Sequence, residues 1–171
     1  LYDCMTEKYF TYCFDPHKRI ESYEKDNEVV EFYETEYEML NQFFQKYLEI
    51  RPTIISGWNS EFFDIPYLYN RAVRILGPEI ANLMSPISEV IYSEYKKKHT
   101  IAGVSSLDYL QLYRQFTFTM QSSYRLDYIG EIEVGMKKVD YEGTLNDLYD
   151  NDLQTFIAVS YTHLTLPTTE A

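Results

Sequence analysis

The chain has 171 residues, which fits one domain with a sizeable core. Hydrophobic residues make up 45% and aromatic residues 17%, and this composition argues against a disordered chain. The formal net charge of −12 is the opposite of the basic footprint of an autonomous nucleic-acid binder. Any contact with nucleic acid therefore has to be local, metal-bridged or supplied by neighbouring domains. Cys4 and Cys13 are too few for a disulfide scaffold, and no apolar run approaches the about 20 residues that span a bilayer.

The first fifty residues predict two strands and one long helix. Lys8–Phe14 and residues 27–33 are rich in β-forming side chains and are followed by turn or polar residues. From Glu36 the apolar residues recur at helical spacing, until Arg51-Pro52 ends the pattern.

The next segment places a single carboxylate between a strand and a helix. Residues 53–56 predict a short buried strand, and Gly57 permits a sharp turn after it. Asp64 is then a good N-cap for a helix that runs through Leu76. In α/β folds the ends of strands carry ligand and metal chemistry, so Asp64 is a candidate ligand. A purely structural cap is the alternative, and one residue can serve both purposes.

The second half of the chain continues the alternation of strands and helices. Residues 87–101 predict a β-hairpin with a basic tip, and residues 101–110 predict a strand that passes into a helix. Further helices are expected over residues 124–129 and from Asn146 onward. This alternation predicts the α/β class, with a mixed sheet flanked by helices.

Several short motifs occur in a specific order along the chain. They are Ser56-Gly57-Trp58-Asn59, Phe63-Asp64, Pro66-Tyr67, Asn70-Arg71, Gly103-Val104-Ser105, Leu107-Asp108-Tyr109-Leu110, Leu112-Tyr113 and Tyr141-Glu142-Gly143. In this order they resemble the exonuclease region of family B DNA polymerases, and most of all the replicative polymerases of T-even-type tailed phages. The resemblance extends over residues 1–158.

The resemblance implies a fold, a reaction and a set of partners. The fold would be ribonuclease-H-like, with an inserted β-hairpin. The reaction would be 3′→5′ proofreading, in which Mg²⁺ or Mn²⁺ ions held by carboxylates hydrolyse the terminal phosphodiester. The parent would be a DNA-directed DNA polymerase in the cytoplasm of a phage's host cell, with no membrane association. Its partners would be the single-stranded 3′ end of primer DNA, the remaining polymerase domains in cis and, as a candidate, the sliding clamp.

The same resemblance assigns roles to individual residues. Asp64 would be a metal ligand, and Asn59 would organise the catalytic site. Aromatic side chains would stack on unpaired bases, and hairpin lysines would meet phosphates. The residues expected to contact DNA are Trp58, Phe62, Phe63, Lys96, Lys97 and Lys98.

Each of these roles has a structural alternative. Asn59 is equally suited to satisfy the backbone groups of a turn, and Trp58 is suited to packing. The three lysines also fit a solvated hairpin tip. Asp108 stands at a strand–helix junction like that of Asp64, and a cap is the simpler interpretation for it.

The chain also departs from the pattern of the family. The first motif of the family is a strand with an Asp-x-Glu pair, and residues 1–14 contain none. In the third motif, Val159 takes the Tyr position and His163 takes the Asp position. Asp64 is then the one expected carboxylate present. We therefore predict that the N-terminal strand of the fold is missing and that the isolated chain is inactive. A catalytically inactive module that positions DNA strands is the alternative, and the reading frame beyond both ends distinguishes the two.

The end of the chain differs in composition from the rest. Residues 160–171 form a Thr-rich string with one charged side chain, after an acidic sequence rich in Tyr and Phe. We predict that residues 1–158 form a partial exonuclease domain and that residues 159–171 are a non-native read-through tail. The nucleotide sequence beyond Val159 tests this prediction, because a continuous phage-like coding context there would contradict it.

Overall fold

The computed structural model describes residues 1–135 and 143–159, and the chain divides into two compact units, Leu1–Leu107 and Asp108–Ala171. The tail predicted for residues 159–171 lies outside the described residues except for Val159, and so does the Tyr141-Glu142 part of the last motif. The strands are β1 (Tyr2–Asp3), β2 (Lys8–Phe14), β3 (Tyr23–Lys25), β4 (Glu28–Tyr33), β5 (Ile54–Gly57), β6 (Val90–Ser93), β7 (Lys98–Ile101) and β8 (Ser105–Asp108).

The helices follow the strands in alternation. The first unit contains α1 (Glu36–Ile50), α2 (Asp64–Ile75), α3 (Pro78–Ala81) and the 3-10 helix η1 (Asn82–Met84). The second unit contains α4 (Tyr109–Phe116), α5 (Leu126–Val134), α6 (Leu145–Asn151) and a helical stretch over residues 153–159. The α/β class predicted from the sequence is confirmed.

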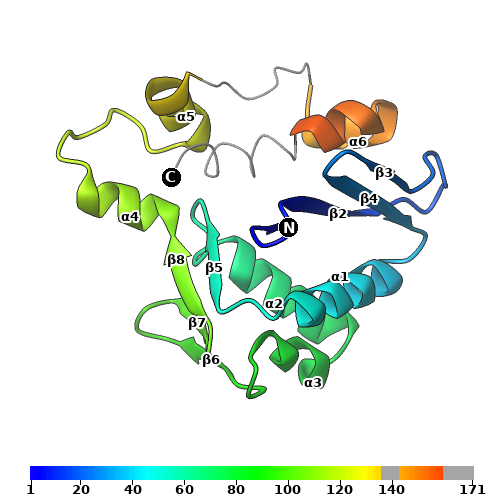
Figure 1. Ribbon diagram of the computed structural model, residues 1–171, viewed down its shortest axis with the longest axis horizontal. Helices are drawn as coiled ribbons and strands as arrows, with labels where there is room; N and C mark the ends of the chain where they lie inside the picture. The colour runs from blue at the N-terminus through cyan, green and yellow to red at the C-terminus, as the bar shows by residue number, and fades with distance from the viewer. Residues whose placement is uncertain (136–142, 160–171) are drawn as a thin grey trace. The chain divides into compact units, whose positions relative to one another are not determined.

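The largest sheet is mixed, with the strand order β1-β2-β4-β3. Strands β2 and β4 pair in parallel from Tyr9 opposite Glu28 to Phe14 opposite Tyr33, whereas the two outer pairs are antiparallel. Helix α1 connects β4 to β5 and packs against β2 and β4 (Figure 1). The mixed sheet with a flanking helix was expected from the sequence. The short strands β1 and β3 were not, because their pairing depends on neighbours in space rather than on a periodic pattern.

Helix α1 illustrates why these residues form this element. The Thr35 side chain accepts a hydrogen bond from the Glu38 amide at 3.2 Å, and this cap fixes the start of the helix. Its end is set by Arg51, which takes the left-handed conformation at φ 49°. Between these ends, one face of the helix enters the core.

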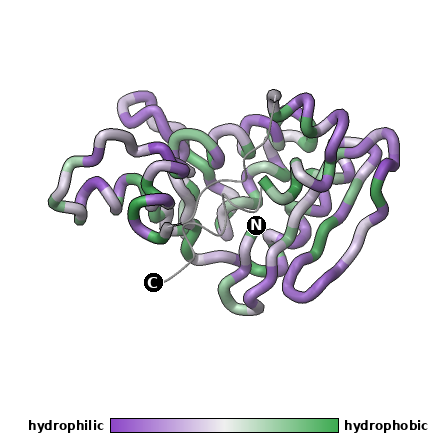
Figure 2. The backbone as a smooth tube through the Cα atoms, turned by 90° about the horizontal axis from the view of Figure 1, so that it is seen from above, coloured by the Kyte–Doolittle hydropathy of each residue, from purple (hydrophilic) through white to green (hydrophobic). Residues whose placement is uncertain are grey.

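The core of the first unit lies between α1, α2 and the α3–η1 segment. The Tyr47 hydroxyl donates to the Met84 carbonyl at 2.9 Å, so the phenol is satisfied although it is buried. Hydrophilic and hydrophobic stretches alternate along the backbone tube (Figure 2). The buried cluster consists of Phe44, Tyr47, Ile65, Ala72, Ala81, Met84 and Ile101.

The prediction of a buried strand over residues 53–56 is wrong. The strand β5 is present, but Ile54 is 56% exposed and Ser56 is also exposed. Within the described residues, β5 pairs with β8 alone and is not part of the four-stranded sheet. A strand in such a narrow sheet has no second layer over each face, so an apolar composition does not ensure burial.

The second unit is built from helices. Tyr113 donates a hydrogen bond to Glu133 at 2.6 Å, which links α4 to α5. The Arg114 guanidinium lies 4.5 Å from the centre of the Tyr124 ring, a cation–π distance. The helix expected over residues 124–129 begins and ends later, at Leu126–Val134, where Gly135 in the left-handed conformation forms its C-cap. The helix expected from Asn146 is α6, with a capping box between Thr144 and Asp147.

Candidate active site around Asp64

A chain of turns connects β5 to the candidate ligand Asp64. The left-handed residue of this segment is Asn59, with φ 62°. Its carbonyl accepts hydrogen bonds from the amides of Phe62 at 3.3 Å and Phe63 at 3.1 Å. Asn59 therefore lies within a turn, in a conformation that Asn tolerates better than most residues.

Gly57 is needed here for close approach rather than for an unusual φ. A Cβ atom at residue 57 would lie 3.0 Å from the Cβ of Ser60, a tighter contact than most Cβ atoms make, so Ser60 would have to shift. Ser60 is buried and its hydroxyl points to the Gly57 carbonyl at 3.4 Å. Gly57 permits the turn that follows it by giving Ser60 room, and Asn59 takes the left-handed conformation within that turn.

Asp64 is the first residue of α2, and the prediction that it is the N-cap is wrong. The N-cap is Phe63, with φ −123° and ψ −67°, and Phe63 provides no side-chain cap. Asp64 instead lies in the first turn of α2 and is exposed.

Aromatic side chains surround this carboxylate in sequence and are unusually exposed. Phe63 is 66% exposed and Tyr67 is 65% exposed, and Phe62 is also exposed. Phe63 and Tyr67 are four residues apart at the start of α2, where the Tyr67 amide donates to the Phe63 carbonyl at 3.0 Å. Residues at this spacing share one face of a helix. Ile65, between them, is buried in the core and anchors the segment. Trp58 is half-buried at the start of the turns.

Helix α2 is attached to α1 by a residue of the same motif. The Arg71 guanidinium makes two hydrogen bonds to the Glu36 carboxylate, in the paired geometry that suits these two groups. This hydrogen bonding holds the pKa of Glu36 below its ordinary value of 4.5. The sequence did not predict the pair, because Glu36 and Arg71 are 35 residues apart.

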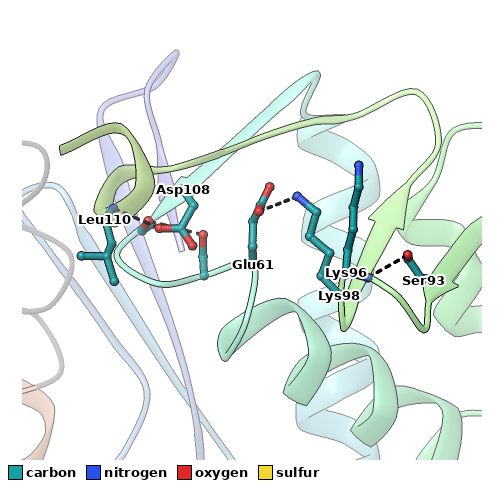
Figure 3. A network of polar contacts seen from close by, with 8 residues as sticks. Glu61, Ser93, Lys96, Lys98, Asp108 and Leu110 are labelled. Atoms are coloured by element: carbon teal, nitrogen blue, oxygen red, sulfur yellow. Dashed lines mark hydrogen bonds and ion pairs between the residues drawn. The ribbon is translucent and has the colours of Figure 1, made fainter. Parts of the chain in front are cut away.

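The three hairpin lysines occupy different environments. Strands β6 and β7 pair antiparallel, from Val90 opposite Ile101 to Ser93 opposite Lys98. Lys97 is exposed and pairs with Glu94 at 3.0 Å. Lys98 belongs to β7 and pairs with Glu61 at 2.6 Å (Figure 3). Lys96 lies at the exposed tip, where its amide donates to the Ser93 hydroxyl at 3.2 Å.

Asp108 is a helix cap, as the sequence suggested. The residue is 3% exposed, and its carboxylate accepts a hydrogen bond from the Leu110 amide at 3.0 Å. The backbone of Asp108 is extended, at φ −69° and ψ 112°, which lets the side chain fold back onto the first turn of α4. Its environment is therefore unlike that of Asp64.

Comparisons with known proteins place this arrangement in a family. The family described as DNA polymerase family B, exonuclease domain, matches residues 4–129. The chain belongs to this exonuclease-domain family. Asn59, Asp64 and the hairpin all lie within the matched residues. The resemblance inferred from the motifs is thereby confirmed.

The chain is similar in sequence to several DNA polymerases. It is 39% identical over 132 residues to the DNA-directed DNA polymerase of Escherichia phage RB69 and 37% identical over 132 residues to that of Enterobacteria phage T4; each match covers 74% of this chain. It is 28% identical over 129 residues to the DNA polymerase catalytic subunit of Saimiriine herpesvirus 2, over 68% of this chain. The match to each phage polymerase covers 15% of that protein's length, and the match to the herpesvirus protein covers 12%.

The described residues contain neither a cluster of metal-ligating side chains nor a membrane-spanning helix. Within residues 1–135 and 143–159, no group of three or more His, Cys, Asp or Glu side chains is arranged to hold a metal ion. Asp64 is therefore at most one ligand of a larger set. Over the same residues, no helix combines the length and the apolar character needed to cross a bilayer.

Proposed function

We propose that the chain is the 3′→5′ proofreading exonuclease segment of a DNA-directed DNA polymerase, with a ribonuclease-H-like fold over residues 1–158. The observation that carries this proposal is the position of Asp64. It is an exposed residue at the start of α2, flanked in the sequence by the exposed aromatic residues Phe63 and Tyr67, inside the region that matches the exonuclease family. Hairpin β6–β7 would be the inserted hairpin of that fold.

The chemistry would be the hydrolysis of the terminal phosphodiester with divalent metal ions. Bound Mg²⁺ or Mn²⁺ would supply an activated water and would stabilise the leaving 3′ oxygen. Asp64 fits one ligand position, because carboxylate oxygens are the preferred ligands of these hard cations. The other ligands would have to come from residues outside the described part of the chain.

The aromatic residues would hold the single-stranded 3′ end of the primer. Phe63, the N-cap of α2, and Tyr67, four residues further on, are both exposed and flank Asp64 in the sequence. Stacking on such rings stabilises an unpaired base without reading its identity, which suits an enzyme that removes any mismatched nucleotide. Phe62 and Trp58 would extend this contact, and Asn59 would keep the turn in shape. Lys96, at the exposed tip, is better placed to meet phosphate than Lys98, which is paired with Glu61.

The polymerase that contains this segment would act in the cytoplasm of the host cell. The remaining polymerase domains would be its partners in cis, and the sliding clamp is a candidate partner.

The test of this function uses the polymerase that contains this segment. We expect D64A to lower exonuclease activity on single-stranded DNA by at least about 100-fold, because removing a metal ligand costs more than removing the groups that merely orient one. Polymerisation on a primed template should be unchanged. D108N is the matched control, since it alters the other junction aspartate and keeps a capping side chain. A D64A enzyme with wild-type exonuclease activity would contradict the proposal and favour a module that only positions DNA strands.

A second experiment concerns the 171-residue chain by itself. We expect it to release no nucleotides from end-labelled single-stranded DNA in the presence of Mg²⁺ or Mn²⁺, because one carboxylate cannot hold two metal ions. Samples with and without metal, resolved on a denaturing gel, provide the measurement. Robust hydrolysis that depends on Asp64 would overturn this expectation.

A further inference from the structure

We propose that the ion pair between Glu61 and Lys98, here called the hairpin bridge, positions the turn that presents Phe63 and Asp64. The proposal concerns the same site and rests on the proposed function for its consequence in catalysis. The bridge joins two segments that are 37 residues apart, one in the turn before α2 and one in strand β7 (Figure 3). Glu61 and Lys98 would be positioning residues rather than catalytic ones.

The hairpin bridge is largely buried. The Glu61 side chain is 13% exposed and the Lys98 side chain is 24% exposed, with 2.6 Å between Nζ and Oε2. Charged groups that have lost most of their water depend on their partner, so removing either partner leaves an unfavourable charge behind. The exposed pair between Lys97 and Glu94 lacks this property, because both of its side chains remain mostly in water.

Glu61 lies in a turn with a buried residue at each end. The turn is fixed at one end by Ser60, which is buried against Gly57, and at the other by Ile65 in the core. The Ile65 amide donates to the Ser60 carbonyl at 2.9 Å. Phe62 and Phe63 lie between these anchors and are exposed, so their side chains contribute little packing to hold the turn. Glu61 and Asp64 are the charged residues of this stretch, and the bridge attaches Glu61 to strand β7.

The hairpin also contacts helix α2 independently of the bridge. The buried ring of His99 lies 4.8 Å from the ring of Tyr69 on α2 and 5.0 Å from the ring of Tyr92 on β6. Burial lowers the pKa of His99, which keeps the imidazole neutral at pH 7. The hairpin therefore stays on α2 when the bridge is broken. Loss of the bridge should loosen the turn without detaching the hairpin.

The experiment uses the 171-residue chain, whose only tryptophan, Trp58, stands at the start of the turn. We expect E61Q and K98M each to raise acrylamide quenching of Trp58 toward the value for the unfolded chain. They should also speed amide hydrogen exchange in residues 58–65. The charge-swapped double variant E61K/K98E should restore both readings, and K97M, which breaks the exposed pair, should change neither. Exchange in residues 36–50 serves as the internal reference.

Two results would overturn the proposal. One is E61Q and K98M behaving like K97M in both measurements. The other is a folded charge-swapped variant that stays as perturbed as the single variants. If K98M does not fold, K98R takes its place. Because Arg retains the positive charge of Lys98, we expect the quenching of Trp58 in K98R to equal that of the wild type, and raised quenching would contradict the bridge. None of these readings requires DNA or metal, so a failure of the proposed exonuclease function would leave them unchanged.

Discussion

Asp64 and Asp108 stand in the same sequence context, each between a short strand and a helix, yet the structure treats them in opposite ways. Asp108 is buried, has an extended backbone and caps α4 through the Leu110 amide. Asp64 is one position further into its helix and is exposed, because the N-cap position belongs to Phe63. A shift of one residue at a helix start therefore decides whether a carboxylate caps the helix or lies exposed in its first turn.

The largest effect on stability is expected at the buried aspartate. D108A should cost about 1–2 kcal/mol of local stability, because the first turn of α4 loses its cap. Hydrogen exchange measured for the Leu110 amide should become faster. D108N is the control, since Asn caps helices as well as Asp does. If D108N were as disruptive as D108A, capping would not be the reason for the burial of this side chain.

A smaller effect on stability is expected at the ion pair between Glu36 and Arg71, which joins α1 to α2. E36Q should lower the unfolding free energy of the first unit by about 1 kcal/mol, since it weakens a partly exposed pair that holds α2 to α1. Urea titration followed by Trp58 fluorescence measures this. E34Q is the matched control: it removes a pair with Lys18 in which both side chains are well exposed, and it should cost less than about 0.5 kcal/mol. Equal losses would show that burial of the pair is irrelevant.

The Glu36 pair also predicts a pH dependence. Arg71 holds the pKa of Glu36 below 4.5, so the unfolded chain takes up this proton at a higher pH than the folded chain does. The stabilisation is therefore present above about pH 4.5 and is lost as the pH falls through the folded pKa. The urea midpoint of the wild type should fall more steeply over this range than that of E36Q. Parallel profiles for the two proteins would contradict the assignment.

The smallest effect is expected at Asp64 itself. D64A should change stability by about 0.5 kcal/mol, which is the scale of the interaction between an exposed carboxylate and the start of a helix. Thermal unfolding of the 171-residue chain measures it. A loss as large as that of D108A would mean that Asp64 has a structural role after all, and would erase the contrast between the two residues.

Much of the site could be predicted from local patterns in the sequence. The strand β2, the helices α1 and α2, the hairpin segment and the family all follow from local patterns, because periodicity and turn residues act over a few neighbours. The cap at Asp108 was within reach for the same reason. The position of Asp64 was missed by one residue, since the boundary of a helix depends on backbone angles that composition does not set.

Contacts between distant segments could not be predicted. Two ion pairs illustrate this: Glu36 and Arg71 are 35 residues apart, and Glu61 and Lys98 are 37 residues apart. In its local sequence each of these side chains looks like an ordinary solvated charge. The prediction of burial failed for a similar reason at Ile54. This residue belongs to an apolar segment typical of a core strand, but the strand lies in a two-stranded sheet. Whether an apolar or charged residue is covered depends on which layer lies above it.

The sequence by itself determined the family, the order of the elements and the candidate ligand Asp64, because these depend on residue types at short spacing. The tertiary structure alone decided that Asp64 is presented to solvent while Asp108 is enclosed, and that Lys98 is committed to Glu61 rather than to the hairpin tip. Exposure and ion pairing are properties of groups brought together by folding. They emerge only when segments distant in the chain share one surface.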